Sequence, residues 1–75
     1  MPKLPQISGK DMGRVLARLG FMPKSQHGSH MKFSRLHDGA KEIIVVPNHK
    51  TLRTGTLGGI LKHLNITLEK LRDLM

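Results

Sequence analysis

The spacing of the apolar residues changes twice along this chain of 75 residues, from a helical period to an alternating one and back. Near the start of the chain, Met12, Val15, Leu16 and Leu19 follow the i, i+3, i+4, i+7 spacing of an amphipathic helix. In residues 31–36 the side chains Met31, Phe33 and Arg35 alternate with Lys32, Ser34 and Leu36, and residues 42–46 end in a β-branched run, as strands do. Residues 57–64 return to the helical spacing. The pattern predicts helices on both sides of a group of strands.

Capping and turn residues set the boundaries of these elements. Ser8 followed by Asp11 is typical of a helix N-terminus, and Gly20 suits the left-handed position after a helix. The Asp38-Gly39 pair favours a tight hairpin turn. The predicted elements are a helix over 9–19, strands over 21–26, 31–36 and 42–46, a helix over 56–64 and a short last helix after Thr67.

The second half of the chain gives three further expectations. Pro47 ends the third strand, and the polar, basic residues 48–53 form a connection that we expect to be mobile. Thr54 or Thr56 is the expected N-cap of the second helix, and Asn65 its end. Gly58 and Gly59 inside that helix favour close packing against the sheet.

Length and composition exclude several classes of protein. A chain this short forms one domain with a thin core, so we predict a single domain over 1–75. It contains no cysteine, which excludes disulfide frameworks, thiolate zinc sites and thiol catalysis. It also lacks a P-loop, a dinucleotide fingerprint and a nucleophile elbow, and we expect no cofactor. Without a long apolar stretch or the apolar centre of a signal peptide, we expect a soluble, cytoplasmic protein without membrane contact.

The charge favours a partner that carries phosphate or acidic groups. Thirteen Lys and Arg against five Asp and Glu give a formal net charge of +8. Such an excess is typical of nucleic-acid binding, because cations that neutralise phosphates release counterions. The only aromatic residues are Phe21 and Phe33, so base stacking contributes little and recognition depends on charge and shape.

The most informative segment is Gly28-Ser29-His30, in which a flexible glycine-serine pair brings a histidine to the start of the second predicted strand. Near neutral pH an imidazole can take a proton from a ribose 2′-hydroxyl, and nearby cations stabilise the charge that develops on phosphorus. The cations expected around it are Lys24, Lys32 and Arg35. The structural alternative is a strand histidine with no chemical role.

A second basic group, His49, Lys50 and Arg53, lies on the connection before the second helix. It can hold phosphates or supply a second proton-transfer group, and its alternative interpretation is a solvated loop. His27 and His30 are three residues apart, but residues at that spacing in one strand point to opposite faces. With no thiolate and few carboxylates nearby, we expect no metal site.

Six short motifs, in this order and spacing, resemble the HicA family of toxins, small mRNA interferases of HicA-HicB toxin-antitoxin pairs. They are Leu4-Pro5 with Ser8-Gly9-Lys10, Leu19-Gly20-Phe21, Gly28-Ser29-His30, Val46-Pro47 with His49, Gly55-Thr56-Leu57, and Ile60-Leu61-Lys62. The resemblance covers nearly the whole chain. It implies an α+β, double-stranded-RNA-binding-domain-like fold, an α-β-β-β-α two-layer sandwich, here with a short extra C-terminal helix. The chain differs from the family pattern at His27, where we expect a Lys, Arg or Asn-like residue, and at Gly58, where a basic residue is common.

The resemblance also implies metal-independent cleavage of mRNA, a cognate HicB-like antitoxin, and His30 as the catalytic residue. We therefore expect a toxin that is an endoribonuclease, with Gly28 and Ser29 supporting His30. The RNA-binding residues expected are Lys24, Lys32, Arg35, His49, Lys50 and Arg53. Two alternatives stay open: a non-catalytic RNA-binding module of the same fold, and an interaction protein that docks an acidic antitoxin.

Overall fold

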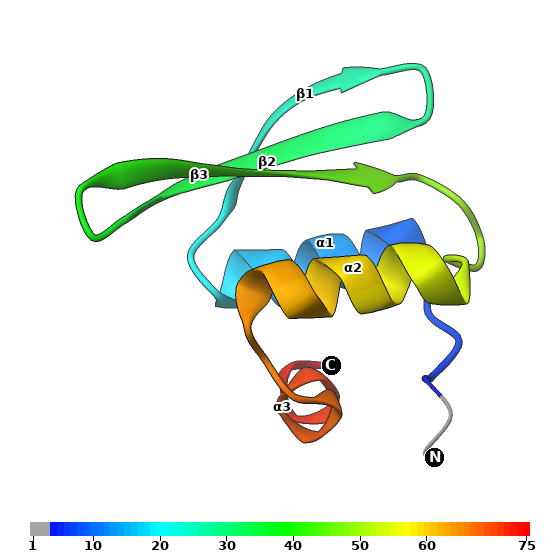
Figure 1. The fold of residues 1–75 in the computed structure, drawn as a ribbon. Helices are drawn as coiled ribbons and strands as arrows, with labels where there is room; N and C mark the ends of the chain where they lie inside the picture. Colours follow the sequence, from blue (N-terminus) through cyan, green and yellow to red (C-terminus); the bar gives the residue numbers. More distant parts are fainter. Residues whose placement is uncertain (1–3) are drawn as a thin grey trace.

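The structure is a computed structural model that describes residues 4–75. Its elements are, in order, α1 (Gly9–Arg18), β1 (Met22–His27), β2 (His30–His37), β3 (Ala40–Pro47), α2 (Thr54–Leu64) and α3 (Leu68–Leu74). The three strands form one antiparallel sheet in the order β1-β2-β3, and the helices lie on one side of it (Figure 1). This confirms the predicted α+β fold, resembling a double-stranded-RNA-binding domain with an extra C-terminal helix. The single domain over 1–75 stays a prediction, and its residues 1–3 lie outside the described residues.

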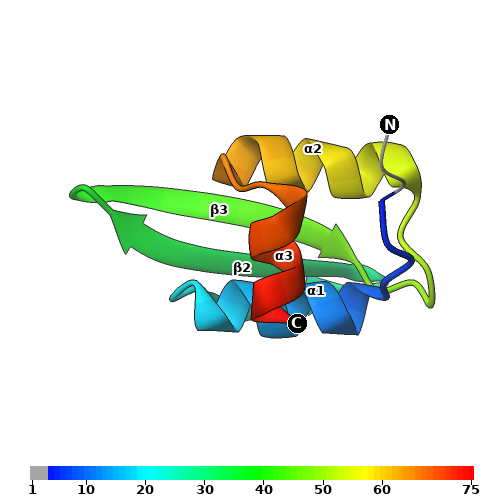
Figure 2. The same cartoon turned by 90° about the horizontal axis from the view of Figure 1, so that it is seen from below.

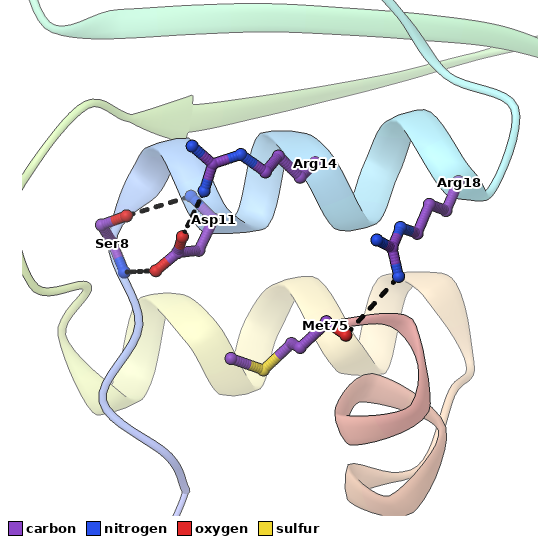
Figure 3. A network of polar contacts seen from close by, with 5 residues as sticks. All are labelled: Ser8, Asp11, Arg14, Arg18 and Met75. Carbon is purple, nitrogen blue, oxygen red and sulfur yellow. Dashed lines mark hydrogen bonds and ion pairs between the residues drawn. The ribbon is translucent and has the colours of Figure 1, made fainter.

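Helix α1 begins and ends where the sequence predicts, to within one residue. The Asp11 N–H donates to the Ser8 hydroxyl at 3.0 Å, and the Ser8 N–H donates to the Asp11 carboxylate at 3.3 Å, which completes a capping box (Figure 3). The helix ends at Arg18, and Gly20 follows with a φ of 95°. The local residues therefore determine both ends of this helix.

Two tight turns connect the strands. Asp38 and Gly39 have φ angles of 51° and 78°, and positive values at both central positions are those of a type I′ hairpin. Gly28, with a φ of 61°, and Ser29 form the turn between β1 and β2. β2 and β3 are longer than predicted, because their pairing continues up to the turn, and β1 has the predicted length but begins and ends one residue later.

The two faces of the sheet have opposite character. Phe33, Ile44 and Val46 point toward the helices and are buried. On the other face Leu36 and Val45 are exposed by 78% and 48%. The core lies between the sheet and the helices and consists of Ile7, Met12, Val15, Leu16, Phe21, Phe33, Ile44, Val46, Leu52, Leu57, Ile60, Leu61, Leu64 and Leu71. The face away from the helices, called the open face below, is free of any covering element in the described part of the chain (Figure 1).

The start of α2 differs from the prediction. Thr54 is already helical, and Arg53 is the N-cap residue with extended backbone, without a side-chain capping bond. The expected threonine cap is therefore wrong. The other signals in this region are confirmed: Asn65 ends α2 with a φ of 55°, and the Thr67 hydroxyl accepts the Lys70 N–H at 3.1 Å at the start of α3.

Gly58 and Gly59 of α2 do not serve helix-to-sheet packing. A Cβ at Gly58 would meet only Leu4, at 3.8 Å, and a Cβ at Gly59 would have no neighbour within 4 Å. The predicted packing role is therefore wrong. Helix α3 lies beneath α1 and α2, on the side away from the sheet, and crosses them (Figure 2). Its Leu71 is fully buried there.

Candidate active site and nucleic-acid interface

His30 is the first residue of β2, the central strand, and its side chain lies on the open face. It pairs with His27 of β1 on one side and with Pro47 of β3 on the other. All three residues are accessible, since His27 and His30 are exposed and Pro47 is half-buried. A large, charged ligand can therefore reach this histidine.

The turn before His30 is held by hydrogen bonds rather than free. The Gln26 side-chain amide donates to the Gly28 carbonyl oxygen at 3.0 Å. The Asn48 N–H donates to the Ser29 carbonyl oxygen. Both turn carbonyls accept a bond, one from β1 and one from the segment after β3, so the glycine-serine pair, expected to be flexible, is held in place.

The connection over residues 48–53 is also held, contrary to the expected mobile loop. The Gly9 N–H donates to the His49 carbonyl oxygen at 2.9 Å, and the Leu52 N–H donates to the Ile7 carbonyl oxygen at 2.8 Å. Leu52 itself is buried in the core. These bonds bring the start of α1, the β1–β2 turn and this connection to one end of the molecule, called the histidine end below (Figure 1).

A cavity of about 300 Å³ opens at the histidine end, between the start of α1 and residues 48–50. Its lining residues are Ser8, Lys10, Asn48, His49 and Lys50. The structure thus brings His49 and Lys50 together with Lys10, which the sequence reasoning did not select as a site residue. The Ser8-Gly9-Lys10 motif contained a signal for it, because a helix that starts beside the connection brings Lys10 there.

The other predicted RNA-binding cations occupy different places. Lys32 lies on the open face two residues along β2 from His30, in register with Ser25 and Val45. Arg53 is exposed at the start of α2. Lys24 lies farther along β1, in the irregular step of the β1–β2 pairing, and lines a different cavity. Lys32 is therefore the predicted cation that shares the face and strand of His30.

Arg35 does not belong to this group. It lies on the helix side of the sheet, where its Nε contacts Glu42 Oε1 at 2.8 Å and its Nη1 donates to the Leu19 carbonyl oxygen at 2.7 Å. The guanidinium carbon lies 4.4 Å from the centroid of the Phe21 ring, a cation–π distance. These contacts occupy the guanidinium, so the structure separates Arg35 from the predicted RNA-binding set.

The carboxylates of the described residues leave the cations near His30 unpaired. Asp11 is engaged by Ser8 and by Arg14, whose Nη1 lies 2.8 Å from Asp11 Oδ1 (Figure 3). Glu42 contacts Arg35 and His63 on the helix side. Among residues 4–75, Lys10, Lys32, Lys50 and Arg53 form no ion pair. Their charge is available to phosphates.

His27 and His30 lie on neighbouring strands as direct partners, so their side chains share the open face instead of pointing to opposite faces. The reason given from the sequence against a two-histidine pair is therefore wrong. Within the part of the chain that the structure describes, no three His, Cys, Asp or Glu side chains gather as a metal site would require.

No helix formed by residues 4–75 has the length and apolar character needed to cross a membrane.

Comparison with known proteins supports one family. Neither the curated proteins nor the solved structures give a match to the chain. The family model described as the HicA toxin of bacterial toxin-antitoxin systems matches residues 9–66, which run from the first residue of α1 to just beyond α2. The chain therefore belongs to the HicA toxin family.

Proposed function

We propose that this toxin is a metal-independent endoribonuclease that cleaves mRNA, with His30 as its key catalytic residue. The observation that carries the proposal is the position of His30: exposed, at the start of the central strand, next to a turn held by hydrogen bonds from two other segments. A catalytic group must be held in a fixed position before substrate binds, because misplacement by about 1 Å can cost about a hundredfold in rate. The bonds to the turn hold the backbone from which the His30 side chain projects.

The chemistry follows from the residue type and its neighbours. A neutral imidazole removes the proton of a ribose 2′-hydroxyl, and the oxygen attacks the adjacent phosphate. The negative charge that develops on the phosphate oxygens is stabilised by ammonium and guanidinium groups nearby. Lys32 lies on the same face as His30, and Lys10 and Lys50 line the cavity at the same end. DNA lacks the attacking hydroxyl and should resist cleavage.

The path of the RNA follows the free cations. It would run over the open face at Lys32 and past the histidine end, where Lys50 and Arg53 are exposed. Gly28 and Ser29 support the site by fixing the turn that presents His30. Each phosphate contact adds about one unit to the dependence of log affinity on log salt. RNA binding should therefore weaken steeply as the salt concentration rises.

The test is incubation of the purified protein with a labelled mRNA in EDTA, beside His30→Ala and His37→Ala. His37 precedes the other hairpin turn and is also exposed, so its variant controls for the loss of a histidine. The parent and His37→Ala should cleave the RNA to fragments with 2′,3′-cyclic phosphate ends, and His30→Ala should not. All three should melt at similar temperatures, because exposed substitutions change stability by only about 0.5 kcal/mol.

Other outcomes favour the alternatives. RNA binding by the parent without cleavage would favour a non-catalytic RNA-binding module. Cleavage that yields only 5′-phosphate ends would contradict His30 as the group that activates a 2′-hydroxyl. Binding of an acidic partner without affinity for RNA would favour an antitoxin-docking protein.

Membership in the family implies an antitoxin partner, and we propose that the antitoxin covers the open face. Four large apolar side chains are exposed there by 41% to 78%, namely Met22, Leu36, Ile43 and Val45. Exposed apolar side chains gathered on one face favour a protein partner, and a partner of negative charge would also occupy the cations that hold RNA. The complex should therefore be inactive, and a complex that cleaves RNA at the rate of the free toxin would contradict this arrangement.

A further inference from the structure

We propose that His27 is the second catalytic residue of this site, the acid that protonates the leaving oxygen while His30 acts as the base. The inference rests on the proposed ribonuclease function, which needs two proton transfers and assigns only one. The register of the β1–β2 pair places His27 beside His30.

The hairpin fixes the relation between the two histidines. A two-residue turn, Gly28-Ser29, makes His27 and His30 direct partners across the β1–β2 pair. Directly opposite residues have Cβ atoms about 4.5–5.5 Å apart and side chains on the same face. Both side chains are exposed. A phosphate bound over this end of the open face can thus contact both imidazoles at once.

Of the groups around His30, His27 is the one placed to take part with it in proton transfer. On the other side His30 faces Pro47 of β3, which does not titrate. Lys32 lies on the same face but two residues along β2, opposite Val45 and Ser25, so it is not a direct partner of His30. The remaining titratable groups of this end, Lys10, His49 and Lys50, line the cavity between α1 and residues 48–50. Among the described residues, His27 is the titratable side chain directly opposite His30.

The proposed step balances its protons and bonds. His30 takes the proton of the 2′-hydroxyl, the bond from the 2′-oxygen to phosphorus forms, and the bond from phosphorus to the 5′-oxygen breaks. His27, in its protonated form, gives its proton to that 5′-oxygen. The products are a 2′,3′-cyclic phosphate and a 5′-hydroxyl end. His30 is left protonated and His27 neutral, and exchange with water restores both.

The experiment compares two oligonucleotide substrates with a single ribonucleotide each. One has the ordinary 5′-oxygen at the cleavage site, and the other has sulfur in that place, because a thiolate leaves without protonation. The proteins are the parent, His27→Asn, His30→Asn and, as the matched control, His37→Asn at the other hairpin. Rates are measured in single turnover with EDTA across pH 5–9.

A catalytic acid gives a specific pattern of rates. On the oxygen substrate His27→Asn should lose about 10²–10⁴-fold in rate, the range for general acid–base catalysis. On the sulfur substrate the same variant should cleave within a few-fold of the parent, whereas His30→Asn should stay slow on both. The parent should show a bell-shaped pH profile on the oxygen substrate, and His27→Asn should lose its high-pH limb. His37→Asn should behave as the parent does.

Three outcomes would overturn the inference, and they separate it from the proposed function. A His27→Asn variant as fast as the parent on the oxygen substrate removes His27 from the chemistry but leaves the ribonuclease intact. A variant equally slow on both substrates assigns His27 to positioning or binding instead of proton donation. A parent that cleaves neither substrate contradicts the ribonuclease itself, and the inference with it.

Discussion

Arg35 and Glu42 face each other across β2 and β3 on the helix side of the sheet, with 2.8 Å between Nε and Oε1. The same carboxylate contacts His63 of α2 through Oε2 at 3.2 Å, and the same guanidinium donates to the carbonyl oxygen of Leu19 after α1. Only 17% of the Arg35 side chain and 19% of the Glu42 side chain are exposed. This pair therefore ties the sheet to both long helices, at the end away from His30.

Arg35→Ala should destabilise the protein without weakening RNA binding. The variant removes two charge-assisted bonds and leaves Glu42 without its closest cation, a loss of about 2 kcal/mol by the range for hydrogen bonds to charged groups. For a domain of this size that corresponds to a fall in melting temperature of about 8–16 °C.

Lys32→Ala is the matched variant and should weaken RNA binding without destabilising the protein. It should keep the melting temperature and reduce the slope of log affinity against log salt by about one. Melting curves and RNA titrations at several salt concentrations check both, and a loss of RNA affinity in a folded Arg35→Ala protein would return Arg35 to the binding set.

The stability of the protein should fall in acid through Glu42. The hydrogen bond from Arg35 lowers the pKa of Glu42 below its ordinary value of 4.5; burial opposes this shift, and the charges of Arg35, His63 and His37 add to it. A carboxyl whose folded-state pKa is lowered stabilises the protein above its unfolded pKa, and that stability is lost as the pH falls through the folded value. Glu42→Gln should thus be less stable than the parent at pH 6, and the difference should shrink below pH 4.5. Denaturant unfolding between pH 3 and 7 measures it, with Glu69→Gln on α3 as a control for the change in net charge; a difference constant with pH would contradict the assignment.

Two glycine substitutions should have opposite effects. A Cβ at Gly9 would overlap the carbonyl oxygen of Pro47, which is backbone and cannot turn aside. Gly9→Ala should therefore push α1 away from the segment after β3 and cost about 1–3 kcal/mol, as overpacked sites do. Gly59→Ala, with no neighbour within 4 Å, should stabilise α2 by about 1 kcal/mol. Thermal unfolding of both variants checks the pair, and a neutral Gly9→Ala would show that the start of α1 can shift freely.

The turn before His30 should be sensitive to its glycine. Gly28 has a φ of 61° with open space around it, so Gly28→Ala meets strain in the backbone and no steric clash. We expect a loss of about 1–2 kcal/mol, the cost of the left-handed conformation for an L-residue, and a smaller loss for Gly28→Asn. Cleavage should fall in the same order if this turn positions His30. Equal stability of the parent and Gly28→Ala, measured by denaturant unfolding, would contradict the turn geometry.

Local signals in the sequence predicted most of the fold. The Ser8 capping box, the Asp38-Gly39 turn and the Thr67 cap depend on residues no more than a few positions apart, and each is confirmed. The prediction of a threonine cap for α2 failed, because the helix begins at Thr54 instead of at residue 56. Thr54 is therefore the first helical residue, and Arg53 takes the N-cap position. Leu52, just before this helix, is buried and its N–H donates to the Ile7 carbonyl oxygen, so contacts with a distant part of the chain hold the segment that enters α2.

The sequence by itself determined the kinds of element, their order and the histidine that begins the central strand, because helix periodicity, alternation and turn chemistry act between near neighbours. The tertiary structure decided which side chains meet. Pairing of β2 with β3 placed Arg35 against Glu42. Pairing of β1 with β2 placed His27 opposite His30 on one face. The register between strands, and which face the helices cover, are set by contacts between segments distant in the sequence, and spacing along a single strand does not contain them.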